Sequence, residues 1–251
     1  MRALQTTLLL AMALLPGIAG AFDHSHSGFT TILKTHVRQG RVDYRALKVS
    51  PDELNRYEGE LAAVTSQEFG SWTRDQQVAY LINLYNARTI SLILENHPIT
   101  SIKRIGWLPG AAWRKEFIPL FGKTVSLNHL EHGLLRANYK LPEIHFALVC
   151  AAKGCPPLRS EAYIAQNLVN QLQDQGRRFL GNATKNRIDL PNRRIYLSPI
   201  FKWFAEDFEG ESGSVTDYLR AFLPKETATK VTKSFEIHYT DYDWSLNSTE
   251  N

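Results

Sequence analysis

The chain has 251 residues, is 43% hydrophobic, and carries 29 basic and 25 acidic side chains. A net charge of +4 is too small to indicate a protein that binds nucleic acid through its phosphates. The length and apolar content suffice to bury a substantial core without the help of disulfides.

The first 21 residues predict a cleavable secretory signal. Arg2 precedes an apolar run from Leu8 to Leu15, and a small-residue cleavage site ends at Ala21. This run is shorter than the roughly 20 apolar residues of a membrane span, and no later stretch is long enough. We therefore expect a secreted or periplasmic protein without an integral membrane segment, whose net charge falls from +4 to +3 when Arg2 is removed.

The remaining residues, 22–251, predict a single α+β domain, because no internal repeat or interdomain linker divides them. The strongest helical pattern covers residues 74–96, where apolar side chains occur on most sides of the helix. Such a helix is expected to be central and mostly buried, and to end at His97 and Pro98. We expect it to pack on a small, mainly antiparallel sheet.

Other elements are predicted on both sides of this helix. Further helices are expected over residues 51–64, 126–138, 160–180, 199–208 and 214–222. Strands are expected over residues 117–121 with a return strand to residue 125, and over 144–150, 187–190, 194–197 and 235–239. Ser126 is expected to be the N-cap of the helix that runs through residue 138. The loop that contains Trp107 and Trp113 is interpreted as either a lid or a surface excursion.

The segment at residues 144–150 is the most informative of these, because it leads from a histidine to both cysteines of the chain. Its apolar run between Pro142 and Gly154 is typical of a buried strand. His145 would then be a polar group in the interior. It needs a partner, since leaving it unpaired costs about 1–3 kcal/mol.

Asn83 and Asn86 form the first candidate site, because residues three apart are neighbours on a helix. Their amides could orient a histidine or bind a substrate amide. The alternative is that they tie the helix to a loop backbone, as buried amides usually do.

Glu131, His132 and Arg136 form the second candidate site. Leu127, Leu130 and Leu134 place Glu131 on the inward side of the predicted helix. A buried carboxylate beside a histidine suits general acid–base chemistry, while the alternative is an ion pair that closes the core. No complete set of metal ligands accompanies the histidines, so neither a metal nor another cofactor is expected.

Cys150 and Cys155 form the third candidate site. In an exported protein the first interpretation is a disulfide that closes a small loop. The alternative is a thiol nucleophile activated by His132 or His145. The two interpretations exclude each other in any one oxidation state.

Several motifs in the same order resemble the DUF547 family, a family without an established function. The motifs are an aromatic-x-x-Asn-x-Tyr-Asn-Ala helix, a Glu-His helix that ends in Leu-Leu-Arg, a His-Phe-Ala-Leu-x-Cys segment that leads to Cys-Pro-Pro-Leu, and a Ser-x-Ile-Phe-x-Trp segment. They stand here at residues 80–87, 130–136, 145–158 and 198–208, and the ending at residues 242–247 is also similar to the family. The resemblance adds Lys202, Trp203 and Asp207 to the candidate binding residues. Phe204 stands where the family often has Tyr.

Two hypotheses of function follow. The first is a hydrolase or transferase that acts on an amide or thioester, with a cysteine or a His-activated water as nucleophile, Glu131 orienting His132, and the Asn amides stabilising an oxyanion. Papain-like and transglutaminase-like folds offer only a loose analogy. The second is a non-catalytic module that binds a small-molecule, peptide or envelope ligand, in which the disulfide and the polar network hold a groove in shape. Asn86, His132 and His145 are expected to converge beside the cysteine loop, because one shared network satisfies three buried polar groups together.

Overall fold

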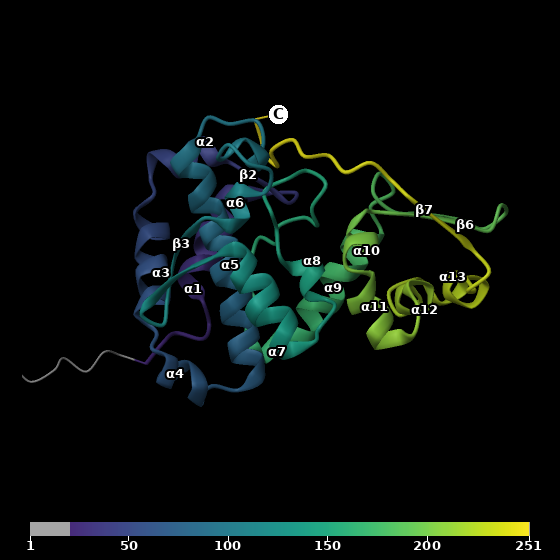
Figure 1. Ribbon diagram of the computed structural model, residues 1–251, viewed down its shortest axis with the longest axis horizontal. Helices are drawn as coiled ribbons and strands as arrows, with labels where there is room; N and C mark the ends of the chain where they lie inside the picture. The colour runs from purple at the N-terminus through teal and green to yellow at the C-terminus, as the bar shows by residue number, and fades with distance from the viewer. Residues whose placement is uncertain (1–20, 251) are drawn as a thin grey trace, which may run out of the picture.

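The computed structural model describes residues 21–250 and has the expected α+β architecture (Figure 1). Apart from Ala21, the predicted secretory signal lies outside the described residues. Within residues 21–250, no helix is both long enough and apolar enough to cross a membrane.

Helices and short strands alternate irregularly along the chain. The α-helices are α1 Ser27–His36, α2 Tyr44–Val49, α3 Asp52–Ala63, α4 Ser66–Ser71, α5 Arg74–Asn96, α6 Ala111–Arg114, α7 Ala137–Tyr139, α8 Ile144–Ala147, α9 Leu168–Leu180, α10 Ile200–Trp203, α11 Ala205–Ser212, α12 Val215–Arg220 and α13 Lys225–Lys230. Two 3₁₀ turns, η1 Ile102–Arg104 and η3 Ala165–Asn167, and one π-helix, η2 His129–Arg136, complete the helical elements of residues 21–250. The strands are β1 Val37–Arg38, β2 Arg41–Val42, β3 Glu116–Leu120, β4 Lys123–Ser126, β5 Arg187–Asp189, β6 Arg194–Leu197 and β7 Glu236–Tyr239.

Helix α5 has the predicted bounds and is mostly buried. A capping box closes its first turn, in which the Thr73 hydroxyl accepts from the Gln76 amide and the Gln76 side chain accepts from the Thr73 amide. Of its 23 residues, 16 are buried. Its main packing partners are α2, α3, η2 and η3 rather than the expected sheet.

The strands form three small sheets instead of one. β1 pairs with β2, β3 pairs with β4, and β5, β6 and β7 form a three-stranded sheet. All pairs are antiparallel except that of β6 with β7, so the prediction of mainly antiparallel pairing is confirmed. Both predicted hairpins are present.

The prediction of a strand over residues 144–150 is wrong. Residues Ile144–Ala147 form the short helix α8, in which the Leu148 amide donates to the Ile144 carbonyl. Every residue from 144 to 149 is buried, so the sequence offers no alternation of faces that would distinguish a strand from a buried helix. The backbone beyond α8 is satisfied by the side chain of Asn86 and not by a neighbouring strand.

Two other predicted helices have different bounds. The helix expected from residue 160 begins at Leu168, because Asn83 binds the backbone of Tyr163 and the next residue, Ile164, is extended. The helix expected over residues 199–208 is divided into α10 and α11 at Phe204, whose φ of −119° lies outside the helical range.

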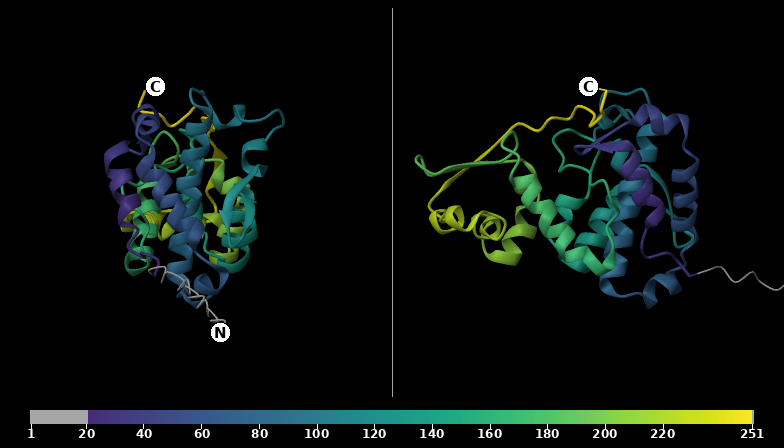
Figure 2. Two further views of the ribbon diagram at one scale, coloured as in Figure 1. Left: turned by 90° about the vertical axis from the view of Figure 1, so that its left-hand side faces the viewer. Right: turned by 180° about the vertical axis from the view of Figure 1, so that it is seen from behind.

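Buried apolar side chains gather in two clusters, one built mainly by the N-terminal helices and one by the C-terminal elements. The N-terminal helices and helices α11 to α13 lie at opposite ends of the molecule (Figures 1 and 2). Helix α8 contributes to both, since Ile144 and Ala147 pack in the first cluster and Phe146 in the second. The segment that follows α8 therefore lies where the clusters meet. The single domain over residues 22–251 stays a prediction.

The C-terminal segment after β7 returns across this boundary to the N-terminal elements (Figure 1). There it pairs with the backbone of residues 151–154, since Asn247 donates to Ala151 while Lys153 and Gly154 donate to carbonyls of residues 245 and 243. This return places residues 242–244 beside the loop that carries the two cysteines.

Candidate functional site

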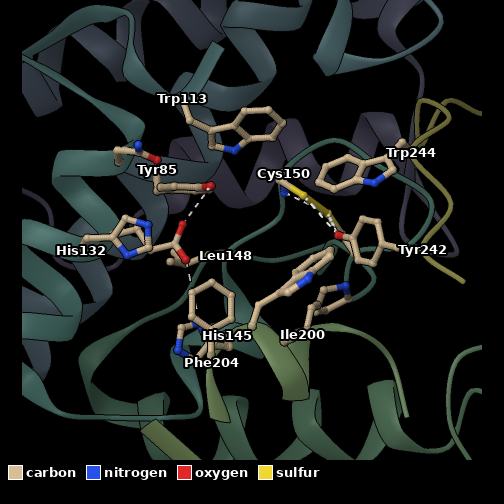
Figure 3. A pocket seen from close by; sticks show the side chains of 15 residues that line it. Tyr85, Trp113, His132, His145, Leu148, Cys150, Ile200, Phe204, Tyr242 and Trp244 are labelled. Carbon is tan, nitrogen blue, oxygen red and sulfur yellow. Dashed lines mark hydrogen bonds and ion pairs between the residues drawn. A yellow bond between two sulfur atoms is a disulfide. The ribbon is translucent and has the colours of Figure 1, made fainter. Parts of the chain in front are cut away.

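A pocket of about 240 Å³ opens where the two clusters meet (Figure 3). Six aromatic side chains from four segments supply much of its lining: Tyr85, Trp113, Trp203, Phe204, Tyr242 and Trp244. The other lining residues are Asn128, Glu131, His132, His145, Leu148, Cys150, Cys155, Pro156 and Ile200. The pocket thus brings together all five predicted catalytic residues and Trp203.

Glu131 enters the pocket from η2. The Ser126 hydroxyl accepts from the His129 amide and, as predicted, caps the helical segment that begins at Leu127 and continues into η2. The helical phase buries Glu131, whose side chain is 11% exposed, and the Tyr85 hydroxyl lies 3.5 Å from its Oε2. Burial raises the pKa of Glu131 to about 7, although the nearby positive charge of Arg136 opposes this shift. The carboxyl can therefore both accept and donate a proton near neutral pH.

His145 lies beneath Glu131 and is held from two sides. Its Nε2 donates to Asp207 Oδ2 at 2.6 Å, and the ring of Phe204 stacks on the imidazole with 3.8 Å between the ring centroids. Burial lowers the pKa of His145 despite the hydrogen bond to Asp207, so the ring is neutral near pH 7. With the proton on Nε2, the bare Nδ1 faces Glu131 Oε1 across 3.9 Å.

Arg136 and Asp207 form a clamp behind the two histidines. The guanidinium donates to both carboxylate oxygens of Asp207, at 2.6 and 2.9 Å, and also to His132 Nδ1 at 3.1 Å. Partial burial opposes ionisation of Asp207, but hydrogen bonds from His145 and Arg136 hold its pKa well below the usual value. Asp207 therefore stays charged and fixes both partners.

His132 also lines the pocket, but it is exposed and is therefore not the buried polar group that the sequence analysis expected. Because Arg136 donates to Nδ1, the neutral ring carries its proton on Nε2, where it can donate to a bound molecule. Burial, followed by the charge of Arg136, lowers the pKa of His132 and favours this neutral form. Glu131 and His132 together offer an acid–base group and a hydrogen-bond donor in one pocket.

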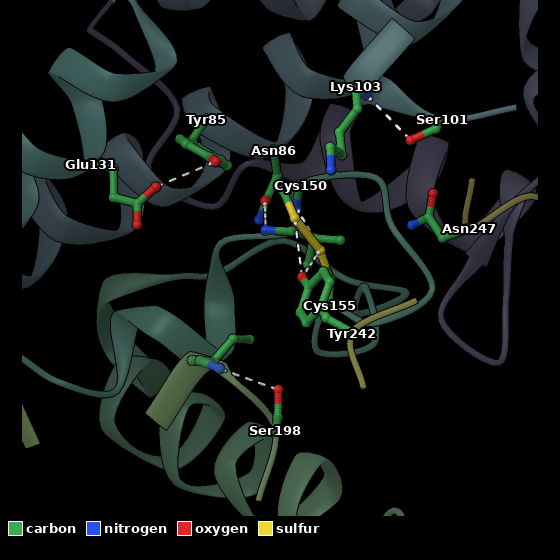
Figure 4. The surroundings of a disulfide bond; sticks show 12 residues. Tyr85, Asn86, Ser101, Lys103, Glu131, Cys150, Cys155, Ser198, Tyr242 and Asn247 are labelled. Atoms are coloured by element: carbon green, nitrogen blue, oxygen red, sulfur yellow. Dashed lines mark hydrogen bonds between the residues drawn. A yellow bond between two sulfur atoms is a disulfide. The ribbon is translucent and has the colours of Figure 1, made fainter. Parts of the chain in front are cut away.

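Cys150 and Cys155 form a disulfide, as predicted, with 6.3 Å between their Cα atoms. Both cysteines and Glu131 line the pocket, and Figure 4 shows the disulfide across from Glu131. Neither sulfur is a thiol in this form, so the structure offers no cysteine nucleophile. The hydroxyl of Tyr242 lies within hydrogen-bond distance of both sulfurs.

Asn83 and Asn86 are buried but do not line the pocket. In each side chain the amide nitrogen donates to a backbone carbonyl and the amide oxygen accepts from a backbone amide. Asn83 donates to and accepts from Tyr163, whereas Asn86 donates to the Ala147 carbonyl and accepts from the Val149 amide. The two asparagines therefore tie helix α5 to loop backbones, which was the alternative interpretation of these residues.

Lys202 is placed away from the pocket. It is exposed, with its ammonium 5.7 Å from the ring centroid of Tyr239. Arg136 and Asp207 also lie outside the pocket lining and act on it through the histidines.

No pattern in the sequence assigns a site role to Tyr85, Phe204, Tyr242 or Trp244, and Trp113 belongs to the loop that was interpreted as either a lid or a surface excursion. The rings of Trp113, Trp244, Trp203 and Tyr242 follow one another at centroid distances of 5.9, 5.9 and 4.9 Å and form one continuous aromatic wall. The sequence signal that could have indicated Tyr242 and Trp244 is that these two aromatic residues occur in a mostly polar C-terminal segment.

Among residues 21–250, no group of three or more His, Cys, Asp or Glu side chains is arranged to hold a metal ion. His129, the other histidine of η2 besides His132, is exposed and does not line the pocket.

The fold and the pocket thus define an α+β protein with a carboxyl–histidine network in an aromatic cavity. Residues 69–180 match the family described as "Protein of unknown function, DUF547", so the chain carries a DUF547 domain. The match spans α5, η2, α8 and both cysteines, whereas Asp207 and Tyr242 lie beyond it. No curated protein and no solved structure matches the chain.

Proposed function

We propose that this protein is a hydrolase or transferase that acts on an amide or thioester bond, with Glu131 as its general acid–base group. The observation that carries the proposal is a buried carboxyl that lines an open pocket and has a pKa of about 7. Burial of this kind is the usual means by which enzymes bring a glutamate into acid–base range.

The nucleophile in this proposal is water or an acceptor hydroxyl or amine, since both cysteine sulfurs are bonded to each other. Ionised Glu131 takes a proton from the nucleophile as its oxygen or nitrogen attacks the acyl carbon. The carbonyl oxygen becomes an oxyanion that accepts a hydrogen bond from His132 Nε2. Protonated Glu131 then gives its proton to the departing amine or thiolate, which returns the carboxylate to its starting state.

His145 and Asp207 act as positioning residues. His145 Nδ1 faces Glu131, and Asp207 fixes the orientation of the ring through Nε2. The lone pair on Nδ1 can hold a protonated Glu131 carboxyl in place after a small closing movement from 3.9 Å. His145 comes from α8 and Asp207 from α11, whereas Glu131 comes from η2.

The aromatic wall favours a substrate with a planar or apolar group next to the bond that is cleaved. Trp203 is 48% exposed at the pocket, and a bound substrate would cover it. We further propose that the protein acts after export, as a secreted or periplasmic protein. The apolar N-terminal run and the disulfide support this location, because disulfides persist in oxidising compartments.

The test is a panel of chromogenic aryl amides and aryl thioesters that vary in the acyl group. Wild-type protein should release the aryl amine or thiol, with a rate that depends on a group of pKa about 7. Glu131→Gln should lower kcat/KM at least about 100-fold. Glu143→Gln is the matched control, because burial also raises the pKa of Glu143 but this residue does not line the pocket. Equal turnover by wild type and Glu131→Gln would contradict the proposal.

A second candidate is the non-catalytic binding module. It is favoured by Asn86, which binds the backbone on both sides of Leu148, and by the disulfide, since both fix the wall of the pocket without offering a reactive group. In that case the same aryl compounds should raise the Tm of the protein without being cleaved, and Glu131→Gln should retain the shift.

A further inference from the structure

We propose that the pocket is also a thiol–disulfide exchange site, in which a small-molecule thiol attacks Cys150 Sγ and Cys155 leaves as the thiolate. The proposal does not depend on the acyl chemistry above. It begins from the different surroundings of the two sulfur atoms.

Cys155 is the protected half of the bond. Both residues line the pocket, and Cys155 also borders a second pocket beside Lys153, but Cys155 is only 2% exposed whereas Cys150 is half-buried. A thiol that enters the pocket therefore reaches Cys150 more readily. Attack on one sulfur of a disulfide makes the other sulfur the leaving group.

Two hydrogen-bond donors point to Cys155 Sγ. The backbone amide of Cys150 lies 3.1 Å from it, and the Tyr242 hydroxyl lies at 3.1 Å, closer than its 3.3 Å to Cys150 Sγ (Figure 4). Sulfur atoms in a disulfide carry no proton, so both groups are donors here. These donors stabilise negative charge as it develops on Cys155 Sγ, which makes this thiolate the better leaving group.

The surrounding chain keeps these donors in place. A Cβ atom at Gly154 would come within 2.9 Å of the Tyr242 ring, so the glycine permits the ring to lie against the loop. The Lys185 ammonium also donates to the carbonyl of Cys155, which places a positive charge next to this residue.

The exchange balances with two equivalents of thiol. The first thiolate bonds to Cys150 Sγ, the S–S bond breaks, and its electron pair passes to Cys155 Sγ. A second thiolate then attacks the sulfur of the bound small molecule and releases Cys150. The protein disulfide is reduced to two thiols, the small thiol is oxidised to its own disulfide, and the two protons of the thiols end on the cysteines.

The experiment uses the oxidised, folded protein and 2-mercaptoethanol as the probe. Samples are quenched with acid at intervals, alkylated, and mapped by mass spectrometry. We expect the mixed disulfide on Cys150 and the alkyl group on Cys155. Tyr242→Phe should slow the reduction about fivefold to tenfold, because one donor to the leaving sulfur is lost. Tyr239→Phe is the matched control and should react like wild type, since Tyr239 has no contact with the sulfurs.

Three results would overturn the proposal: the mixed disulfide on Cys155, an unchanged rate in Tyr242→Phe, or reduction only at denaturant concentrations that unfold the protein. Cys155→Ser provides a second test that does not require reduction. Its free Cys150 thiol should react with iodoacetamide in the folded state, and a folded but unreactive variant would contradict access through the pocket.

Discussion

The Asp207 carboxylate accepts a hydrogen bond from His145 Nε2 at 2.6 Å across 62 residues of sequence. This bond joins α11 to α8, and the Arg136 guanidinium on the same carboxylate extends the link to η2. One aspartate thereby fixes the groups behind the pocket, and its role can be tested separately from any activity.

Asp207→Asn should destabilise the protein by about 2–3 kcal/mol, because it removes the charge that Arg136 and buried His145 share. Urea unfolding at pH 7 gives the free energy of unfolding. Glu206→Gln, at an exposed neighbouring position, should change it by less than about 0.5 kcal/mol. Equal free energies of unfolding for Asp207→Asn and wild type would mean that the clamp formed by Arg136 and Asp207 contributes nothing to stability.

The pKa of Glu131 predicts a specific pH dependence of stability. The folded pKa of about 7 lies above the ordinary value of 4.5, so the folded state binds the extra proton between these values. This contribution to stability is therefore complete below about pH 4.5 and is lost as the pH rises to 7. The stability of Glu131→Gln relative to wild type should increase by about 2–3 kcal/mol between pH 5 and 8. Chemical unfolding of both proteins across this range measures the difference, and a constant difference would show that Glu131 titrates normally.

Asn86→Ala should destabilise the protein by about 2–4 kcal/mol, because it leaves the buried Ala147 carbonyl and Val149 amide without partners. Asn170→Ala, which removes an exposed amide on α9, serves as the control. Thermal and urea unfolding should separate the two variants clearly. A small effect of Asn86→Ala would indicate that the segment after α8 does not need this clamp.

Gly176→Ala tests the close contact of α9 with the second cluster. A Cβ at this position would overlap the Phe222 ring, whose Cδ1 lies 2.6 Å away, and would come within 3.2 Å of Phe146. We expect a loss of about 1–3 kcal/mol despite the higher helix propensity of alanine. Gly59→Ala on α3 meets no atom within 4 Å and should instead stabilise the protein by about 0.5–1 kcal/mol.

The sequence by itself determined the elements whose signals are local. Thr73 and Gln76 mark the start of α5, and the turn residues of the two hairpins lie between alternating strands. The burial of Glu131 was also predictable, because the fully buried Leu127 and Leu130 mark the inward side of the same helical segment, although the π-helix η2 buries Leu135 where the prediction had Leu134. In each case the interactions that decide the structure lie within a few residues of each other.

Only the tertiary structure decided how residues 144–150 fold and where the pocket lies. A run that is buried on all sides carries no periodicity, so its backbone conformation depended on what Asn86, more than 60 residues earlier, could bind. Tyr242 likewise reaches the pocket, and Asp207 reaches His145 behind it, from segments that the N-terminal motifs do not specify. Such contacts depend on how the two apolar clusters pack against each other, and no local pattern of residues encodes that arrangement.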